Sequence, residues 1–348
     1  MIHVLALALL ASLPHIALAQ TGTSMSPSAY GGRLEGFDYA FPVREFTFQS
    51  QGQSLVMAYL DVPPSRDANG RTVLLLHGKN FCAGTWESTI RALTAAGYRV
   101  IAPDQIGFCK SGKPAMYQFS FAQLAANTRA LLQSLGIDSS VVLGHSMGGM
   151  LATRYALQYP DATEQLLLVN PIGLEDTKAL GGRWQDVDAW YAGELKTTHA
   201  SIRTYQQSVY YGGDWKPEYQ RWVDMLGGMY TGPDRERVAW NQALASDMVY
   251  NQPVLYEFGN IRVPTTLFIG QKDRTAFGKA LAPKAIADTL GNYPALGRRA
   301  AQAIPGARLV TFDDLGHSPQ VEAPGRIEAA LLQALQRDTA AATSPASP

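Results

Sequence analysis

The chain has 348 residues, enough for one large domain with an insertion or for two modest domains that each bury a core. It contains 29 basic and 29 acidic residues, so its formal net charge is zero. This balance leaves no excess charge to attract a phosphate backbone or an anionic lipid surface. We therefore expect neither nucleic acid nor a membrane surface as a partner.

The N-terminus has the pattern of a secretory signal. MIHVLALALLASLPHIALAQ is an apolar run that ends in the A-x-A cleavage pattern ALA, directly before Gln20. A short amphiphilic tail is the alternative. Pro14 and His15 interrupt the run, which is too short for a membrane span. We expect a signal peptide at 1–19 and a periplasmic or secreted mature protein without a membrane span.

Strand and helix patterns alternate along most of the chain. VREFTFQS and SLVMAYLDV alternate apolar and polar residues, as the strands of a hairpin do. Continuous apolar runs, typical of parallel strands covered on both faces, follow at TVLLLH, YRVIAP, SSVVLG, EQLLLVN, VPTTLFIG and ARLVTFDD. Helical stretches lie between or after these runs, at Thr85–Ala96, Phe121–Leu135, Met147–Tyr159 and Gly325–Gln336. The alternation predicts an α/β fold with a doubly wound, mostly parallel sheet.

The alternation stops between Asp176 and Ile261, where Trp, Tyr and Met recur at helix-like spacing between Gly-Gly breaks. We interpret this stretch as a helical lid over the carboxyl ends of the strands, where ligands bind in open α/β sheets. For any single aromatic residue here, a local core without a binding role is the alternative. We expect a linker at 20–36, the first part of the core at 37–176, the lid at 177–262, the second part of the core at 263–337 and a disordered tail at 338–348.

Ser146 lies between two glycines in VVLGHSMGGM, directly after an apolar run. G-x-S-x-G alone is a weak signal, and a small residue in a Gly-rich loop is the alternative. Here strand, sharp turn and helix follow in order, which favours a nucleophile held on a strained turn. Side chains at Gly144 or Gly148 would collide with the neighbouring strand and helix. The N–H of Met147 would begin the helix, and we expect it to stabilise an oxyanion.

A serine hydroxyl needs a base within hydrogen-bonding reach. His317 follows the last strand in a Gly-containing loop, which favours it as the base over a surface-loop histidine. His145 flanks Ser146 and is expected to point away from it, and His199 lies in the lid. His77 ends the first central strand, where we expect it to organise the loop backbone rather than to act in catalysis.

Asp273 is the predicted acid of the triad. It follows the strand VPTTLFIG and lies between Ser146 and His317, in the chain order nucleophile, acid, histidine. Glu175 and Asp176, past the preceding strand, are the reserve candidates. A buried acid would fix the imidazole tautomer and stabilise the imidazolium that forms when Ser146 loses its proton.

The loop HGKNFCAGTW is expected to supply the second oxyanion donor. The pair His77-Gly78 permits a tight turn that aims a backbone N–H inward, from either Lys79 or Asn80. The position directly after His-Gly favours Lys79, and Asn80 stays open. Nowhere along the chain do His, Cys and acidic residues occur together at the spacing of metal ligands, so we expect neither a metal nor another cofactor.

The motifs LLLHGKN, PDQIGFCKSGKP, GHSMGG, GQKD and GHSPQVEAP together resemble the α/β-hydrolase family. They are most similar to its lidded members, typified by epoxide hydrolases, haloalkane dehalogenases, carbon–carbon bond hydrolases and small carboxylesterases. The resemblance covers roughly residues 43–335. Epoxide hydrolases and dehalogenases carry an aspartate nucleophile and His-Gly-x-Pro, whereas this chain has Ser146 and Asn80 at these positions. Because serine attacks acyl carbon, the resemblance implies acyl transfer to water.

The resemblance also bears on the pocket and the substrate. The segment between Asp273 and His317 is longer than usual for the family, so an extra loop or helix is expected to border the pocket. The leading expectation is a serine hydrolase of small carboxylic esters, with an apolar or aromatic substrate favoured by the lid. Lactone, amide or carbon–carbon bond hydrolysis on the same triad is the first alternative, because all pass through the same oxyanion. A non-catalytic ligand receptor is the second.

The two cysteines of the chain, Cys82 and Cys109, each fall a few residues past the carboxyl end of a central strand. In the family's usual strand order these two strands are neighbours, so the resemblance implies that both loops emerge side by side. Export would place the cysteines in an oxidising compartment. We therefore expect a disulfide between Cys82 and Cys109, with two small buried thiols as the alternative.

Overall fold

The structure, a computed structural model, describes residues 28–343; the expected signal peptide and residues 344–348 lie outside the described residues. Its centre is an eight-stranded sheet in the order β1-β2-β4-β3-β5-β6-β7-β8. The strands are β1 Val43–Ser50, β2 Gln53–Val62, β3 Thr72–Leu76, β4 Arg99–Pro103, β5 Ser140–His145, β6 Thr163–Val169, β7 Thr265–Gly270 and β8 Arg308–Phe312. β2 is antiparallel to β1 and β4, and the remaining pairs are parallel, which confirms the predicted fold class.

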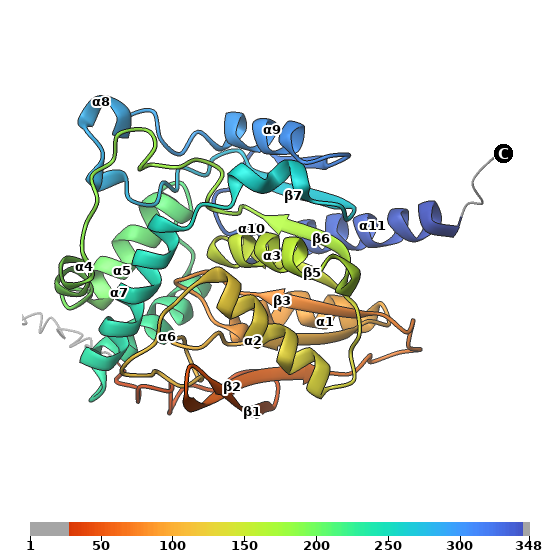
Figure 1. Cartoon of the computed structure of the whole chain (residues 1–348), viewed down its shortest axis with the longest axis horizontal. Coiled ribbons are helices and arrows are strands. Elements are labelled where there is room, and N and C mark those ends of the chain that lie inside the picture. Colours follow the sequence, from red (N-terminus) through yellow and green to blue (C-terminus); the bar gives the residue numbers. More distant parts are fainter. Residues whose placement is uncertain (1–27, 344–348) are drawn as a thin grey trace, which may run out of the picture.

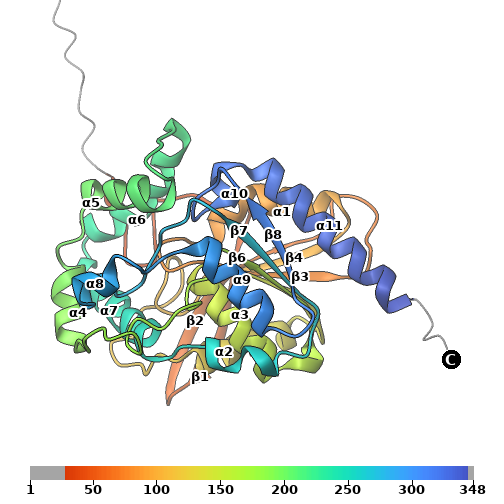
Figure 2. The same ribbon diagram turned by 90° about the horizontal axis from the view of Figure 1, so that it is seen from above.

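Helices cover both faces of the sheet, as Figure 2 shows. One face carries α2 Phe121–Ser134, α3 Met147–Gln158 and α9 Tyr293–Ala303, and the other carries α1 Glu87–Ala95, α10 Pro319–Glu322 and α11 Pro324–Thr343. Along β3, Leu74 and Leu76 pack into one core while Val73 and Leu75 pack into the other. Both faces of the sheet are therefore shielded from water. This explains why the central strands are continuous apolar runs rather than alternating ones.

The expected lid lies between β6 and β7 (Figure 1). Its helices are α4 Val187–Glu194, α5 His199–Tyr205, α6 Gln220–Thr231 and α7 Arg235–Asn251, and a π-helical turn at Gln206–Tyr210 continues α5. These helices gather at one side of the sheet, opposite the free end of α11 (Figure 1). In the described part of the chain, no helix has both the length and the apolar character of a membrane span.

The segment before β1 is packed and not a free linker. Leu34 is fully buried, and the N–H of Tyr30 donates to the carbonyl of Gly228 in α6 at 2.9 Å. The N–H of Gly32 donates to the carboxylate of Asp234 at the same distance, 2.9 Å. The expected linker at 20–36 is thus wrong for its described residues, because backbone N–H groups of Tyr30 and Gly32 bond the lid residues Gly228 and Asp234.

The C-terminal helix is also longer than expected. α11 runs to Thr343, whereas the sequence pattern predicts a helix end at Gln336 and a disordered tail at 338–348. The added stretch, DTAAAT, lacks large apolar residues but contains three alanines, and alanine has the highest helix propensity. The helix therefore continues past Gln336, and the rest of the expected tail lies outside the described residues.

Candidate active site

Ser146 occupies the sharp turn between β5 and α3. Its backbone angles, φ 57° and ψ −123°, are strained for a residue with a side chain. A Cβ on Gly144 would lie 2.1 Å from the carbonyl oxygen of Gly148, and a Cβ on Gly148 would lie 2.1 Å from that of Leu76. These backbone contacts cannot give way, so the two glycines are required for the predicted reason.

His317 joins Ser146 to Asp273. Its Nε2 lies 2.9 Å from the Ser146 Oγ, and its Nδ1 lies 2.7 Å from the Asp273 Oδ2. His317 and Asp273 are fully buried, and Ser146 is 5% exposed. A carboxylate only accepts, so Nδ1 carries the hydrogen and Nε2 presents its lone pair to the serine hydroxyl. The structure thus brings the three predicted residues together in an arrangement that can remove the serine proton.

Asp273 is held by two further donors. The Asn170 amide donates to Oδ2 at 2.8 Å, and the N–H of Thr275 donates to Oδ1 at 2.7 Å. The Asn170 carbonyl oxygen in turn accepts the N–H of Gly270 at 3.0 Å. Sequence reasoning did not identify Asn170. The signal was present, since this residue is the polar end of the apolar run EQLLLVN on the strand beside β7.

Three residues, His145, Tyr210 and Glu322, hold the loop that carries His317 by hydrogen bonds. His145 Nε2 donates to the His317 carbonyl at 2.8 Å, and the Tyr210 carbonyl accepts the His317 N–H at 2.8 Å. The Glu322 carboxylate accepts the N–H groups of the residues on either side of His317, at 2.9 and 3.1 Å. Burial lowers the pKa of His145 well below its ordinary value, so this ring is neutral and its proton is on Nε2.

These hydrogen bonds add residues that sequence reasoning did not identify. The sequence predicts only that His145 points away from Ser146. In the structure the centroid of the His145 ring lies 5.0 Å from that of the His317 ring, and His145 supports the His317 loop. Glu322 had a signal in the motif GHSPQVEAP, where a short helix returns the acid towards the histidine loop. Nothing in the lid sequence indicates that the Tyr210 carbonyl bonds the predicted base.

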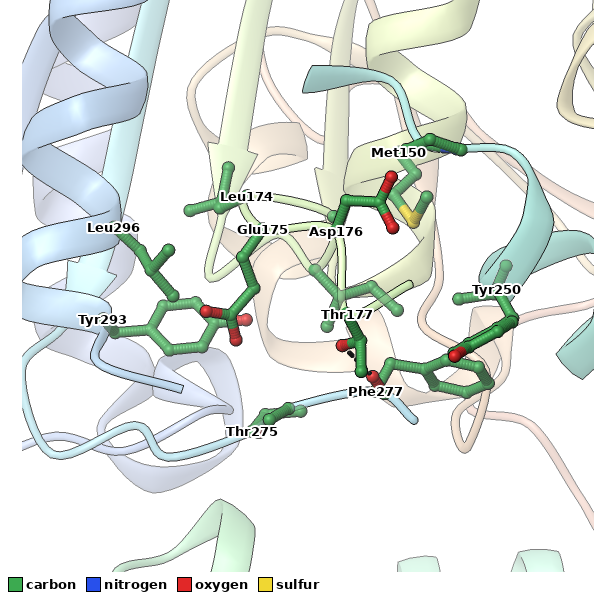
Figure 3. Close-up of a pocket in the computed structure, with 15 residues that line it drawn as sticks. Met150, Leu174, Glu175, Asp176, Thr177, Tyr250, Thr275, Phe277, Tyr293 and Leu296 are labelled. Atoms are coloured by element: carbon green, nitrogen blue, oxygen red, sulfur yellow. Dashed lines mark hydrogen bonds between the residues drawn. The ribbon is translucent and has the colours of Figure 1, made fainter. Parts of the chain in front are cut away.

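The reserve acids Glu175 and Asp176 do not bond to His317, whose Nδ1 is bonded to Asp273. They line a separate small cavity of about 30 Å³ beside the triad, and Figure 3 shows the Glu175 carboxylate turned towards Tyr293. Burial raises the pKa of Glu175. This cavity has room for about one water molecule, so it is too small for a substrate.

His77 organises the loop after β3, as predicted. Its Nδ1–H donates to the Gly78 carbonyl at 2.8 Å, and its Nε2 accepts the N–H of Gln105 at 3.0 Å. Burial lowers the pKa of His77, which keeps the ring neutral for both contacts. His199, the lid histidine, bonds within the lid, where its Nδ1 lies 3.3 Å from the hydroxyl of Thr231.

Two candidate oxyanion donors border the Ser146 turn. Met147 is the first residue of α3, so its N–H has no acceptor within the helix. The turn after β3 closes with a 3.1 Å bond from the Phe81 N–H to the Gly78 carbonyl, and Lys79 and Asn80 form its tip. Neither tip N–H has an acceptor among the described residues, and both tip residues line the Ser146 cavity. The structure therefore leaves the N–H groups of Lys79 and Asn80 both available as the second oxyanion donor.

The Ser146 hydroxyl opens into a cavity of about 380 Å³ between core and lid. Its aromatic walls are Trp190, Tyr205, Tyr210, Tyr230 and Phe277. Phe277 belongs to the long segment between Asp273 and His317, which also contains α8 Lys284–Ala287 and α9. Neither α8 nor α9 contributes a lining residue, so the expected extra loop or helix does not border this cavity; the segment reaches it only through residues close to Asp273. The volume is within the range of small-molecule sites.

The predicted disulfide is present. Cys82 and Cys109 are bonded, their Cα atoms are 5.8 Å apart, and β3 and β4 pair as neighbours. Asp104 lies beside the bond, where it accepts the N–H of Ala83 at 2.7 Å. Within the described residues, Cys82, Asp104 and Cys109 form a group of metal-ligand residue types, but the two sulfurs bond each other.

Comparison with known proteins identifies the family. A family model described as the alpha/beta hydrolase fold matches residues 71–324. The chain belongs to the α/β-hydrolase family. A crystal structure of a probable hydrolytic enzyme from Pseudomonas aeruginosa PAO1 is 62% identical with a TM-score of 0.88, and the match covers 89% of this chain and 99% of that one. The family and this likeness support a hydrolase over the receptor alternative.

More distant relatives of this hydrolase differ in the reaction that their names state. The enol-lactonase of Burkholderia xenovorans LB400 shares the fold at 22% identity and a TM-score of 0.63, over 84% of this chain and 100% of that one. The 2-hydroxy-6-oxo-6-phenylhexa-2,4-dienoate hydrolase of Burkholderia cepacia is 40% identical over 108 residues. That match spans 30% of this chain and only 38% of the relative's length.

Proposed function

We propose that this hydrolase cleaves small, uncharged carboxylic esters through an acyl-enzyme on Ser146. The observation that carries the proposal is the 2.9 Å contact between His317 Nε2 and the Ser146 Oγ, at a cavity with no unpaired charge among its described lining residues. An activated serine attacks carbonyl carbon, and an ester offers both that carbon and an alcohol oxygen as leaving group.

In the first half-reaction, His317 Nε2 takes the hydroxyl proton as the Ser146 Oγ forms a bond to the acyl carbon. Asp273 stabilises the resulting imidazolium through Nδ1. The carbonyl oxygen becomes an oxyanion, and the N–H groups of Met147 and Lys79 would bind it. When the tetrahedral intermediate collapses, the carbon–oxygen bond to the alcohol breaks and His317 gives its proton to the departing oxygen.

In the second half-reaction, His317 removes a proton from a water molecule as that water attacks the acyl carbon. The same two N–H groups would bind the second oxyanion. Collapse breaks the bond between the acyl carbon and the Ser146 oxygen, and His317 returns the proton to this oxygen. The products are an acid and an alcohol, and neither metal nor redox cofactor is required for any step.

The charges of the cavity favour an uncharged substrate. Among the described residues that line it, Lys79 and Glu194 carry the charges, and the Lys79 Nζ lies 2.7 Å from the Glu194 Oε1. A substrate carboxylate would have to displace Glu194 from Lys79, which would leave Glu194 buried and unpaired. The aromatic walls suit a bulky apolar or aromatic acyl or alcohol group.

Carbon–carbon bond hydrolysis is the second candidate, because the Burkholderia cepacia relative is named for a dienoate substrate. A dienoate carries a carboxylate, and the paired Lys79 offers no free cation to bind it. Lactone hydrolysis is a third possibility that uses the same steps as ester hydrolysis, with the alcohol retained on the acyl group.

We also propose that the mature protein is periplasmic or secreted. The Cys82–Cys109 bond supports this location, since structural disulfides persist in oxidising compartments. The apolar N-terminal run with its A-x-A pattern supports it as well. Sequencing the N-terminus of the protein recovered from the cell envelope or medium tests the location, and an N-terminus at Gln20 is expected. Recovery of the intact chain from the cytosol contradicts it.

A substrate panel tests the proposed reaction. It contains aryl and alkyl esters of graded acyl length, a lactone of similar size and 2-hydroxy-6-oxo-6-phenylhexa-2,4-dienoate, with Ser146→Ala as the control. We expect ester turnover that the control lacks, and little turnover of the dienoate. Preferred cleavage of the dienoate at the expense of all esters would replace the ester proposal with carbon–carbon bond hydrolysis.

A further inference from the structure

The turn that carries the second oxyanion donor is tied to both the core and the lid. On the core side, His77 bonds the Gly78 carbonyl, and the disulfide at Cys82 fixes the residues that follow. On the lid side, both tip residues reach across the cavity. The Asn80 amide donates to the Tyr210 hydroxyl at 2.8 Å, and the Lys79 ammonium bonds Glu194.

Glu194 is the meeting point of the lid helices. It is the last residue of α4, and its Oε1 lies 2.7 Å from the Lys79 Nζ. Its Oε2 accepts the hydroxyl of Tyr230, from α6, at 2.5 Å. The hydroxyl of Ser246, from α7, lies 3.4 Å from Oε1. One carboxylate thus links three lid helices to the residue whose N–H we assign to the oxyanion hole.

The pair is shielded from water, which gives it more strength than a surface ion pair. The side chains of Lys79 and Glu194 are 13% and 15% exposed. Solvent and salt therefore screen their attraction little, and the tyrosine and serine hydroxyls fix the carboxylate oxygens in place. The Lys79 N–H and side chain branch from the same Cα, so an anchored ammonium restricts movement of the turn tip.

Small shifts of this tip matter because an oxyanion donor acts over a narrow range of distance. Displacement of a catalytic group by about 1 Å can cost about a hundredfold in rate. Loss of one donor costs about 10²–10³ in kcat. A lid that holds the tip can therefore set the rate without contact with the reacting atoms.

We propose that the Lys79–Glu194 ion pair positions the oxyanion turn, so that the donor N–H is correctly placed only while the lid is seated on the core. Glu194 is then a positioning residue supplied by the lid. The inference rests on the proposed serine chemistry. It holds whether Lys79 or Asn80 supplies the N–H, because both belong to the tip that the pair anchors.

The test compares Lys79→Met, Glu194→Gln and the double variant. Each retains every backbone N–H, and methionine keeps most of the length of the lysine stem. The readout is the second-order rate at which a small ethoxy fluorophosphonate labels Ser146, a reaction in which Oγ displaces fluoride while the phosphoryl oxygen occupies the oxyanion hole. We expect a ten- to hundredfold lower rate for each single variant.

The double variant separates positioning from stability. Both single variants leave one buried group unpaired, and the double variant removes both charges, so its melting temperature should recover towards that of the wild type. Its labelling rate should stay as low as in the single variants, because all three lack the same bridge. A labelling rate that recovers together with the melting temperature would overturn the inference, as would wild-type labelling in either single variant.

Two further variants complete the design. Glu164→Gln breaks the Arg71–Glu164 pair, which spans 2.9 Å at the start of β3 and β6, and should leave the labelling rate unchanged. Tyr230→Phe removes only the hydroxyl that bonds Glu194 and should lower the rate several-fold even if the charge variants fail to fold. An unchanged rate in Tyr230→Phe counts against the inference.

The same experiment distinguishes this inference from the proposed function. Fluorophosphonate labelling needs no knowledge of the substrate. Fast wild-type labelling without turnover of any ester would reject the ester proposal and leave the positioning test intact. Where an ester is turned over, kcat should fall in parallel with the labelling rate while KM changes little. A change confined to KM would mean that Lys79 and Glu194 bind substrate instead.

Discussion

Glu322 should make the stability of the protein depend on pH. Its carboxylate lies behind the His317 loop, where burial raises its pKa to about 7 and the N–H groups of Gly316 and Ser318 oppose that rise only in part. The folded protein therefore binds this proton more tightly than the unfolded chain, in which the carboxyl has its ordinary value of 4.5. The resulting stabilisation is fully present below pH 4.5 and is lost as the pH rises through about 7.

The magnitude follows from the two pKa values. At 1.36 kcal/mol per pH unit, the step from 4.5 to about 7 corresponds to about 3 kcal/mol, of which about 2.5 kcal/mol falls between about pH 5 and about pH 8. Glu322→Gln keeps one carbonyl acceptor and cannot titrate, so it lacks this pH dependence. Other titrating groups contribute equally to both proteins and cancel in the difference.

Guanidinium chloride unfolding of both proteins with the disulfide intact, at several pH values from about 5 to about 8, measures the effect. The unfolding free energy of the wild type minus that of Glu322→Gln should fall by about 2–3 kcal/mol across this range. Parallel profiles would refute the reasoning. A difference that rises with pH would mean that the two N–H donors outweigh burial and hold the carboxyl ionised.

Three further predictions concern the site and its supports. Asp273→Asn should lower kcat by about 10⁴ in steady-state assays, because the imidazole would lose its correct tautomer; near wild-type turnover would reject this acid. Replacing Cys82 and Cys109 with alanine should lower the unfolding free energy by about 3.5 kcal/mol for a separation of 27 residues, and unchanged denaturant midpoints would contradict it. Gly148→Ala should abolish soluble folded protein, because its Cβ would lie 2.1 Å from a backbone carbonyl; a folded, active variant would show that the turn can relax.

The sequence predicts the sheet and the triad well because local patterns determine both. Strands that are covered by helices on both faces must be continuous apolar runs, and these runs are visible in the sequence. Ser146, Asp273 and His317 each follow the end of such a run, so the order of the strands brings them to one edge of the sheet. Gly144 and Gly148 are predictable too, since a strained turn leaves no room for side chains on either side.

The supports of the site were beyond sequence reasoning because they join residues far apart in the chain. Lys79 and Glu194 are 115 positions apart, and neither has a local pattern that names its partner. The Tyr210 carbonyl bonds the N–H of His317 only because the lid folds back over the last strand. Likewise, the expected linker is held by bonds from Tyr30 and Gly32 to lid residues that lie far away in the sequence.

Trapping of the acyl-enzyme tests the central claim most directly. The protein is mixed with an ester that it turns over, quenched in acid within the first turnover and digested, and the acylated peptide is located by mass spectrometry. We predict that the acyl group is on Ser146, and that His317→Ala and Ser146→Ala accumulate none. Ester turnover with the acyl group on another residue, or with no covalent intermediate under conditions where acylation outpaces hydrolysis, would contradict the account.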